Sequence, residues 1–353
     1  MQRLLMKGNE ALAEAAIKAG CRHYFGYPIT PQNEIGAYMS KRMPQVDGVF
    51  LQAESEIAAV NMVLGASAAG ARAMTSSSSP GISLKTEGIS FLAGSDLPAL
   101  IANIQRGGPG LGTIQPAQSD YNQAVKAPGH GDLRLLVFTP STVQEMVDCV
   151  FEAFDLTEKY RMPGMLLCDG LLGQMMEPVS FPETTPVTSQ KPWALTGHDN
   201  KRASNIITSL NLDPELSWQA NQARFEKYAE VEKTQAKAES FMSEDADIVL
   251  VAYGACARIA RSAITSARAQ GIKAGLLRPI TVWPFPKEQL LAASKNAKAL
   301  LAVEMSMGQM VDDVRLTVEG KKPVHFFGRT GGVIPTPNEV LEQIKTIDGG
   351  TGA

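Results

Sequence analysis

Four short stretches of this 353-residue chain place polar side chains directly after an apolar run that predicts a β-strand. They are Tyr27-Pro28-Ile29-Thr30-Pro31, Gln52 to Val60 with Glu54 and Glu56, Thr75 to Ser83 with four consecutive serines, and Arg106 to Gly112. Open α/β sheets bind ligands in crevices at the carboxyl ends of their strands. The four loops are therefore the places where the sequence predicts chemistry.

The first and fourth loops contain groups that suit substrate binding. Pro28 and Pro31 restrict the backbone on both sides of Thr30, so the Thr30 hydroxyl is held in a rigid frame. Arg106 precedes a glycine-rich run, where its guanidinium can hold a carboxylate through two parallel hydrogen bonds. That run has neither the dinucleotide-binding spacing nor a Walker A sequence. A purely structural turn at Thr30 and a solvated arginine at the glycine turn are the alternatives that the residues leave open.

The second loop begins a helix with two carboxylates that point in different directions. Glu56 shares a helical face with Ala59, Val60 and Val63, so we expect it on the apolar side, where a carboxylate forms strong hydrogen bonds. Glu54 can interact with the helix N-terminus from solvent. This arrangement suits Glu56 for acid or base chemistry, and a pair of N-terminal capping acids is the alternative.

The serine-rich loop, Ser76 to Ser79, leads into a helix whose free N–H groups could hold an anion. It lacks the pattern of a nucleophile elbow, and capping of the helix explains most of its hydroxyls. Cys168-Asp169-Gly170 followed by Asn200 departs from the Gly-Asp-Gly…Asn arrangement that holds magnesium and a diphosphate. We therefore predict no metal site in this chain.

Cysteines and histidines are few and scattered. Four cysteines lie far apart without a C-x-x-C pair, which favours neither a disulfide framework nor a cysteine-bound cluster (Cys21, Cys149, Cys168 and Cys256). Only four histidines are present, which disfavours a histidine-rich metal site. Any redox chemistry is therefore expected to need a partner.

The elements that position the four loops follow from the alternation of apolar runs with helical patterns between residues 8 and 180. This alternation predicts a doubly wound α/β domain with six strands, at 23–27, 49–52, 71–75, 99–104, 135–138 and 164–167. Helices are expected at 9–19, 55–68, 81–93 and 142–159. Residues 178–200 are rich in Pro, Thr and Ser and predict a linker or arm.

A second, smaller α/β domain is expected from Asp247 onward. Before it, Asp213-Pro214 is typical of a helix start, and Trp218, Phe225 and Tyr228 fall on one face of the helix that follows. We interpret this helix as a connection that packs through its aromatic side chains. The second alternation predicts strands at 248–252, 273–277, 299–304 and 324–327, and helices at 255–269, 287–294, 308–319 and 338–347.

Composition excludes several classes of protein. Apolar residues make up 44% and charged residues 20% of the chain, and the formal net charge is -3, which gives no nucleic-acid footprint. No apolar run is long enough to span a bilayer. The N-terminal segment carries charge early and continues into an amphipathic pattern, unlike a signal peptide. We expect a cytoplasmic protein.

The chain resembles the alpha subunit of 2-oxoacid:ferredoxin oxidoreductases, thiamine-dependent enzymes that convert a 2-oxoacid to its acyl-CoA and reduce ferredoxin. The motifs are the Tyr27 to Pro31 loop, the Glu56 helix, Arg106, Val251-Ala252-Tyr253-Gly254 and Leu277 to Pro286. The resemblance covers nearly the whole length. Leu51 to Ser83 and the lead Met6-Lys7-Gly8-Asn9-Glu10 look most like the branched-chain, 3-methyl-2-oxobutanoate (2-ketoisovalerate) type, with the 2-oxoglutarate type as the alternative.

The resemblance implies roles for individual residues. Glu56 matches the glutamate that hydrogen-bonds the aminopyrimidine of thiamine diphosphate, and the family's loop places Pro28 and Ile29 at the cofactor. Thr30 matches a threonine that contacts the substrate, and Arg106 matches the arginine that pairs with the substrate carboxylate. The expected catalytic residues are therefore Glu56, Thr30 and Arg106.

The resemblance also implies a division of the chain and of the chemistry. Residues 1–185 would form a pyrimidine-binding domain, 186–244 a linker and connecting helix, and 245–353 a transketolase C-terminal-like domain. Mg²⁺ and the diphosphate would belong to the beta subunit, and [4Fe-4S] clusters to partners that include a gamma and a ferredoxin-like delta subunit. Coenzyme A and ferredoxin would be the other reactants. The rival interpretations are another thiamine enzyme, such as a transketolase-like subunit, and a non-catalytic α/β assembly module.

Overall fold

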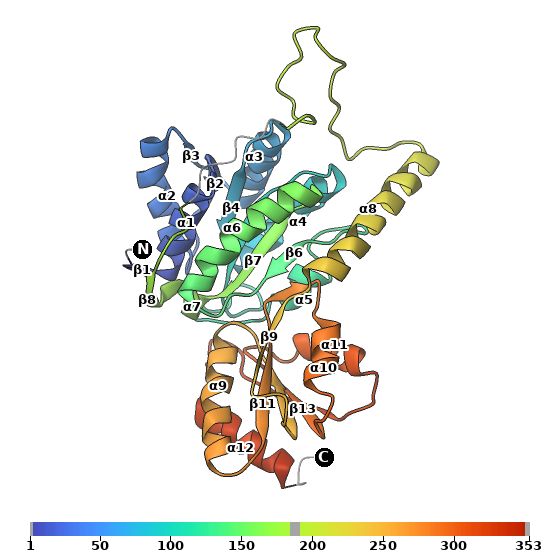
Figure 1. The fold of residues 1–353 in the computed structure, drawn as a ribbon. Helices are drawn as coiled ribbons and strands as arrows, with labels where there is room; N and C mark the ends of the chain where they lie inside the picture. Colours follow the sequence, from blue (N-terminus) through green and yellow to red (C-terminus); the bar gives the residue numbers. More distant parts are fainter. Residues whose placement is uncertain (1–2, 184–190, 350–353) are drawn as a thin grey trace.

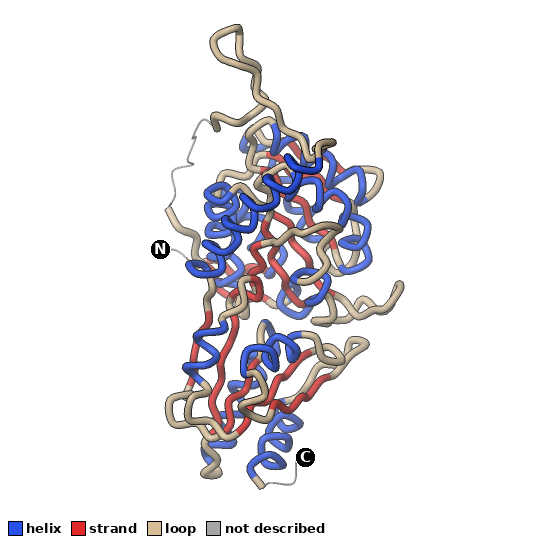
Figure 2. Tube along the Cα trace, turned by 90° about the vertical axis from the view of Figure 1, so that its right-hand side faces the viewer, coloured by secondary structure: helices blue, strands red, loops and turns tan. Residues whose placement is uncertain are grey.

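Two β-sheets, each covered by helices, form the body of the protein and lie one above the other (Figures 1 and 2). This computed structural model describes residues 3–183 and 191–349. The expected boundary between residues 185 and 186 lies outside the described residues. The first sheet has seven strands and the second has five. The α/β class expected from the alternating pattern is confirmed in both parts.

The first sheet has the strand order β12-β6-β7-β5-β4-β2-β3. Its paired strands are parallel except β12, which runs antiparallel to β6. The strands are β2 His23–Gly26, β3 Val49–Gln52, β4 Ala73–Ser77, β5 Leu100–Gln105, β6 Leu136–Phe138, β7 Gly164–Asp169 and β12 Thr281–Trp283. Central strands β5 and β7 are buried at every position, as expected for strands covered on both faces. All six expected strands are present, and β12 is an addition from the C-terminal part.

Helices cover both faces of this sheet (Figure 1). They are α1 Gly8–Lys18, α2 Asn33–Arg42, α3 Glu56–Ala68, α4 Ser79–Gly94, α5 Tyr121–Val125, α6 Val143–Tyr160 and α7 Gly170–Gln174, with a 3₁₀ turn at Met43–Val46. The sequence pattern predicted four of them and missed α2, α5 and α7. In α2 only Ile35 and Met39 are buried, so its apolar periodicity is weak. The two other helices have five residues each, which is too short for a periodic pattern.

Part of the expected linker is a strand. Met176–Val179 (β8) pairs antiparallel with Leu4–Lys7 (β1), so the segment that follows the first domain begins within a two-stranded sheet. The segment between residues 191 and 213 then leads away from the body to α8, Pro214–Gln235 (Figure 1). Asp213 caps this helix by accepting a hydrogen bond from the backbone N–H of Glu215 at 2.8 Å. The capping signal at Asp213-Pro214 is therefore confirmed.

The aromatic face of α8 is only partly buried. Tyr228 is 3% exposed and makes edge-to-face contacts with Phe225 and with Trp283 of β12. Trp218, in contrast, is 56% exposed, so the expectation that all three aromatic residues pack was wrong for the first turns of the helix. The helix is thus fixed to the body through its C-terminal half.

The second sheet has the order β14-β13-β10-β11-β9, and only β9 runs antiparallel to its neighbour. Its strands are β9 Ala238–Phe241, β10 Ile248–Val251, β11 Ala274–Pro279, β13 Ala299–Glu304 and β14 Val324–Gly328. Its helices are α9 Gly254–Ala269, α10 Lys287–Ala293, α11 Met310–Val318 and α12 Pro337–Asp348. Helices α9 and α12 pack together on one face, and α10 and α11 lie on the other (Figure 1). Every strand and helix expected here is present.

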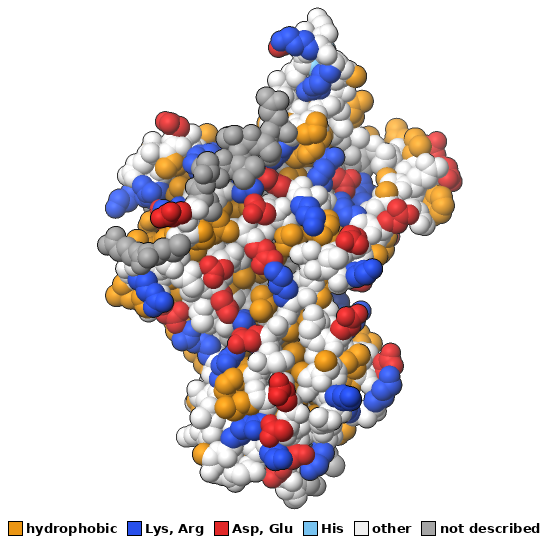
Figure 3. Space-filling model, viewed as in Figure 1, with side chains coloured by type: hydrophobic (Ala, Val, Ile, Leu, Met, Phe, Trp, Pro, Cys, Tyr) orange, Lys and Arg blue, Asp and Glu red, His pale blue; other side chains and the backbone are white. Residues whose placement is uncertain are grey.

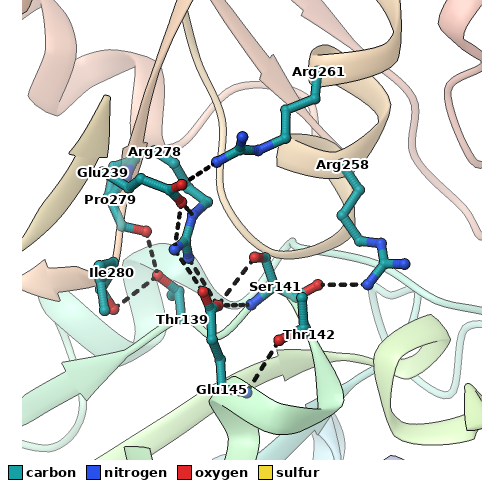
Figure 4. Close-up of polar contacts among 10 residues, drawn as sticks. All are labelled: Thr139, Ser141, Thr142, Glu145, Glu239, Arg258, Arg261, Arg278, Pro279 and Ile280. Atoms are coloured by element: carbon teal, nitrogen blue, oxygen red, sulfur yellow. Dashed lines mark hydrogen bonds and ion pairs between the residues drawn. The ribbon is translucent and has the colours of Figure 1, made fainter. Parts of the chain in front are cut away.

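A polar network joins the two sheets through β11 (Figure 4). The guanidinium of Arg278 is 2% exposed and donates two hydrogen bonds to Glu145 of α6, at 3.0 and 2.8 Å, and one to Glu239 at 2.8 Å. Arg258 of α9 donates to the carbonyl of Ser141 at 3.2 Å. Arg278 is buried, whereas the side chains of Glu145 and Glu239 are 31% and 41% exposed, so both carboxylates remain partly hydrated. The network therefore fixes the orientation of the second α/β unit.

The carboxyl ends of the parallel strands in the two sheets face each other. Asp169, at the end of β7, accepts a hydrogen bond from the N–H of Ala255 at 2.8 Å. Gln118 accepts one from the N–H of Met305 at 3.1 Å and donates to the Tyr253 carbonyl at 2.9 Å. Loops that follow strands of the first sheet thus lie against loops that follow strands of the second.

The surface is mixed in charge. On the face in Figure 3, basic and acidic side chains are interspersed, which agrees with a formal net charge of -3. Among the described residues, no helix is long and apolar enough to cross a membrane.

Candidate active site

Three of the four predicted loops meet at the carboxyl edge of the first sheet, because β5, β4 and β2 are neighbours. Arg106 follows β5, and its Nη1 donates a hydrogen bond to the carbonyl of Thr30, after β2, at 3.0 Å. Its Nη2 donates to the carbonyl of Leu111 at 3.1 Å. The backbone N–H of Arg106 donates to the hydroxyl of Ser79, after β4, at 3.0 Å. The structure therefore brings Thr30, Arg106 and the serine loop together.

The Arg106 side chain retains unused donor capacity. It is 8% exposed, and its Nε is a buried donor without a hydrogen-bond partner among the described residues. A guanidinium has five N–H donors, and the two carbonyls use only one each at Nη1 and Nη2. A carboxylate can therefore be accepted here.

Behind the arginine, an acidic group missed in the sequence holds the serine loop. Asp120 accepts hydrogen bonds from the Ser79 hydroxyl at 2.6 Å and from Asn103 Nδ2 at 2.9 Å. Burial raises the pKa of Asp120, and these two hydrogen bonds oppose the rise. Asn103 lies inside β5 and Asp120 beyond a glycine-rich loop, so no local pattern connected them with Ser79.

Glu56 occupies the first turn of α3, one position after its cap. The Ser55 hydroxyl accepts a hydrogen bond from the backbone N–H of Ala58 at 3.2 Å, which is the usual N-cap interaction. Glu56 is 6% exposed, whereas Glu54 is exposed to solvent. This is the arrangement that helical spacing predicted for the two carboxylates.

The Glu56 carboxylate keeps hydrogen-bond acceptor capacity that the described residues do not use. It accepts no hydrogen bond from any residue that the structure describes, and the buried hydroxyls of Ser77 and Ser78 are likewise without described partners. A Cβ on Gly81 would lie 2.6 Å from Glu56 Oε1 and 2.0 Å from Ser77 Oγ, so only glycine fits here. We call this close arrangement of Glu56, Ser77 and Gly81 the cradle, and its carboxylate keeps acceptor capacity that suits a ligand with hydrogen-bond donors.

A buried lysine lies behind Glu56. Lys85 of α4 is 0% exposed, and its Nζ donates to Thr75 Oγ1 at 3.0 Å and to the backbone carbonyl of Glu56 at 3.4 Å. Burial lowers the pKa of Lys85 to about 8, and the negative charge of Glu56 opposes this shift. Sequence reasoning missed it, although its spacing from Ile82 and Ile89 places it on the buried face of the helix.

Two cavities open next to the Thr30 loop. One of about 420 Å³ is lined by Thr30 and Pro31, and one of about 270 Å³ is lined by Tyr27 and Pro28. Ile29, which lies between Pro28 and Thr30 in the sequence, is half-buried. No described hydrogen bond joins Glu56 to Thr30 or Arg106, and Glu56 lines neither of these two cavities.

Asp169 belongs to the Cys168-Asp169-Gly170 stretch, which departs from the magnesium-binding arrangement. Its role in the structure is to hold neighbouring segments together. Its carboxylate accepts hydrogen bonds from the backbone N–H groups of Leu172 at 3.0 Å and Ala255 at 2.8 Å. Burial raises the pKa of Asp169, and these hydrogen bonds oppose the rise. The residue caps α7 and holds the second α/β unit.

Family models match both parts of the chain. The model described as "Pyruvate flavodoxin/ferredoxin oxidoreductase, thiamine diP-bdg" matches residues 14–243. The model described as "Pyruvate:ferredoxin oxidoreductase core domain II" matches residues 246–340. The first contains every candidate residue of the site, and the second contains the loops that face it.

Full-length relatives agree with these models. The chain is 49% identical over 353 residues to "Ketoisovalerate oxidoreductase subunit VorB" of Methanothermobacter thermautotrophicus, covering 99% of both chains. It is 35% identical over 376 residues to "2-oxoglutarate synthase subunit KorA" of the same organism, covering 98% of this chain and 99% of the relative.

A solved structure shares the fold. It is the 2-oxoglutarate:ferredoxin oxidoreductase from Magnetococcus marinus with 2-oxoglutarate, coenzyme A and succinyl-CoA bound, with a TM-score of 0.87 and 28% identity. The match covers 98% of this chain and 65% of that one, so the present chain spans about two thirds of its length.

Proposed function

Because this chain belongs to the thiamine diphosphate-dependent 2-oxoacid:ferredoxin oxidoreductases, we propose that it is the alpha subunit of a cytoplasmic enzyme for branched-chain 2-oxoacids. The proposed reaction converts 3-methyl-2-oxobutanoate, coenzyme A and two oxidised ferredoxins to the acyl-CoA, CO₂, a proton and two reduced ferredoxins. The observation that carries the substrate is the 49% identity to a ketoisovalerate subunit, against 35% to a 2-oxoglutarate subunit.

The cradle around Glu56 supports a pyrimidine subsite. Thiamine diphosphate, when bound, supplies the nucleophilic carbon and the electron sink for decarboxylation. We assign Glu56 to accept a hydrogen bond from the aminopyrimidine ring, which places a buried carboxylate where a proton must move. Gly81 lets the Glu56 carboxylate pack closely against the start of α4, and Pro28 and Ile29 contact the cofactor from the neighbouring loop. These assignments rest on the open acceptor and on the position of the loops.

Arg106 and Thr30 support a substrate subsite. We assign the guanidinium of Arg106 to hold the carboxylate of the 2-oxoacid, using donors that the two loop carbonyls leave free. Thr30 offers its hydroxyl to the substrate from the loop whose carbonyl Arg106 already binds. Asp120 and Asn103 act indirectly, because they fix Ser79, which fixes the Arg106 backbone.

Other components of the reaction belong to partners in this proposal. The relatives are named as subunits, which supports an assembly of several chains. We assign Mg²⁺ and the diphosphate to a beta subunit, and [4Fe-4S] clusters to partner subunits that include a ferredoxin-like delta chain beside a gamma chain.

The test is reconstitution. We expect the isolated chain to show no thiamine-dependent turnover, and the complex with its beta, gamma and delta subunits to reduce ferredoxin with 3-methyl-2-oxobutanoate and coenzyme A. Turnover by the chain alone would contradict the division of labour.

The same assay separates the alternatives. A higher kcat/KM for 2-oxoglutarate than for 3-methyl-2-oxobutanoate would favour the other substrate type, to which the 35% identical relative belongs. A complete complex that turns over neither acid would favour the alternative that the chain is a non-catalytic assembly module.

A further inference from the structure

The larger cavity at the carboxyl edge adjoins Thr30 and has a mostly apolar lining. Its volume is about 420 Å³, and the first turn of α2, the loop after β5, the helix α7 and the second α/β unit all contribute to it. Its apolar side chains are Pro31, Ile114, Pro116, Leu171 and Ile334. We propose that this cavity receives the aliphatic side chain of a branched-chain 2-oxoacid, and that Ile114 and Ile334 select for it. The inference rests on the proposed function and deepens it.

The cavity and the proposed carboxylate subsite have Thr30 in common, although Arg106 itself does not line the cavity. Thr30 lines the cavity, and its backbone carbonyl is the group that Arg106 binds at 3.0 Å. A 2-oxoacid whose carboxylate pairs with Arg106 has its side chain only two carbon atoms away from that carboxylate. An acid held at this point therefore has a side chain within reach of the apolar lining.

The two isoleucines come from segments that are packed against each other. Ile114 belongs to the loop after Arg106, in which Gly107 and Gln115 are hydrogen-bonded at 3.0 Å. A Cβ on Gly332 would lie 2.4 Å from Gln115 Cβ, so the glycine lets the loop of the second unit approach that closely. The backbone of Arg329 donates to the Glu304 carbonyl at 3.2 Å and holds the start of this loop on the second sheet. The second unit thus presents Ile334 to the cavity on a supported segment.

Both isoleucines retain surface that a ligand can cover. Ile114 is 56% exposed, and Ile334 is half-buried. Covering an apolar side chain contributes about 25 cal/mol per Å² of buried area, and one methylene group in such a pocket discriminates about tenfold or more. The volume also admits the side chains of branched 2-oxoacids with one additional carbon, so the expected class is broader than a single acid.

The polar part of the wall disfavours a second carboxylate. Glu34 lines the cavity and accepts hydrogen bonds from Asn9 at 2.8 Å and Gln174 at 3.0 Å, and Lys7 is ion-paired with it at 3.4 Å. Burial raises the pKa of Glu34, but the hydrogen bonds outweigh it and leave the pKa below its ordinary value. No lysine or arginine is among the described residues that line the cavity. An ionised glutamate here repels the distal carboxylate of 2-oxoglutarate.

The experiment uses the assembled complex and compares kcat/KM for 3-methyl-2-oxobutanoate, 4-methyl-2-oxopentanoate and pyruvate. We expect Ile334→Ala and Ile114→Ala each to lower the values for the two branched acids about tenfold and to change that for pyruvate less than about twofold. The matched control is Val333→Ala, because Val333 is 57% exposed and does not line the cavity. Because Ile114 is also exposed, its truncation removes little of the packed core.

Two outcomes distinguish failure of the pocket from failure of the proposed function. If the wild-type complex uses branched acids but both isoleucine variants keep the selectivity of Val333→Ala, the pocket assignment is overturned while the function stands. If the wild-type complex does not use branched acids, the proposed function itself is wrong. Glu34→Gln adds an independent arm, in which kcat/KM for 2-oxoglutarate is expected to rise about threefold to tenfold, and an unchanged value would remove Glu34 from selection.

Discussion

The Arg106 loop and the Glu56 helix start lie at one edge of one sheet, yet their polar groups are held in opposite ways. The Arg106 guanidinium already bonds two carbonyls, and its backbone is anchored through Ser79 to Asp120. The Glu56 carboxylate accepts no hydrogen bond from a described residue and lies against Gly81 and the buried, unpartnered Ser77 hydroxyl. Substituting Arg106 is therefore expected to lower stability and substrate binding together, whereas substituting Glu56 is expected to lower mainly function.

The largest effect is expected at Glu56, where the comparison predicts a large loss of function with little loss of stability, the small loss arising because the Glu56 charge favours the buried Lys85 ammonium. Glu56→Gln removes the charge but keeps the size of a side chain that bonds no described residue. We expect C2 hydrogen exchange of thiamine diphosphate in the assembled complex to slow by about 100-fold or more. The melting temperature should stay within a few degrees of the wild type.

The matched control is Glu54→Gln, which changes an exposed carboxylate two residues away in the same helix start. It is expected to leave the exchange rate unchanged. An unchanged exchange rate in Glu56→Gln as well would contradict the assignment of Glu56 to the cofactor.

Arg106→Lys is expected to have the next largest effect. It tests the member of the comparison that several hydrogen bonds hold in place. A lysine cannot reproduce the forked geometry, so the Thr30 and Leu111 carbonyls lose their shared donor. Hydrogen bonds to charged groups contribute about 1.5–3 kcal/mol, so we expect KM for the 2-oxoacid to rise roughly tenfold to a hundredfold and the melting temperature to fall. A raised KM with an unchanged melting temperature would show that the arginine is not a structural anchor.

Gly81→Ala is expected to have a smaller effect, confined to the open subsite. The added Cβ would lie 2.0 Å from Ser77 Oγ and 2.6 Å from Glu56 Oε1, so the cradle must shift. Overpacking costs about 1–3 kcal/mol, and we expect thiamine diphosphate to bind the complex about tenfold more weakly by calorimetry. Gly65→Ala is the control, because its Cβ would meet nothing within 4 Å and alanine favours a helix. Equal affinities for the two variants would contradict the cradle.

The same contrast explains what the sequence could predict. Strand ends and helical spacing are local signals, and they placed Thr30, Arg106 and the burial of Glu56 correctly. Ile334 and the cavity depend on the approach of two units far apart in sequence, so no local pattern contains them. β12 was missed because its three residues lie in the proline-rich run from Pro279 to Pro286. Lys85 is a charged residue on the apolar face of a predicted helix, so its burial could have been predicted. The helical pattern alone does not single it out.

Lys85 gives the smallest and most specific test, through the pH dependence of stability. Its pKa falls from 10.5 in an ordinary environment to about 8 in the folded chain, because burial disfavours its charged form. The unfolded chain therefore binds more protons between these two values, so stability rises with pH across that window. Below pH 8 the lysine is protonated in both states, and the full cost of burying its charge is present.

Lys85→Met replaces the ammonium with an uncharged side chain of similar length, so this cost should disappear. We expect the variant to be more stable than the wild type at pH 7 by at most about 3 kcal/mol, a bound set by the pKa difference. The difference should shrink as the pH rises from 8 toward 10.5, which urea unfolding at several pH values can measure. A variant that is less stable at pH 7 would instead show that the lysine stabilises the fold by pairing with the Glu56 charge.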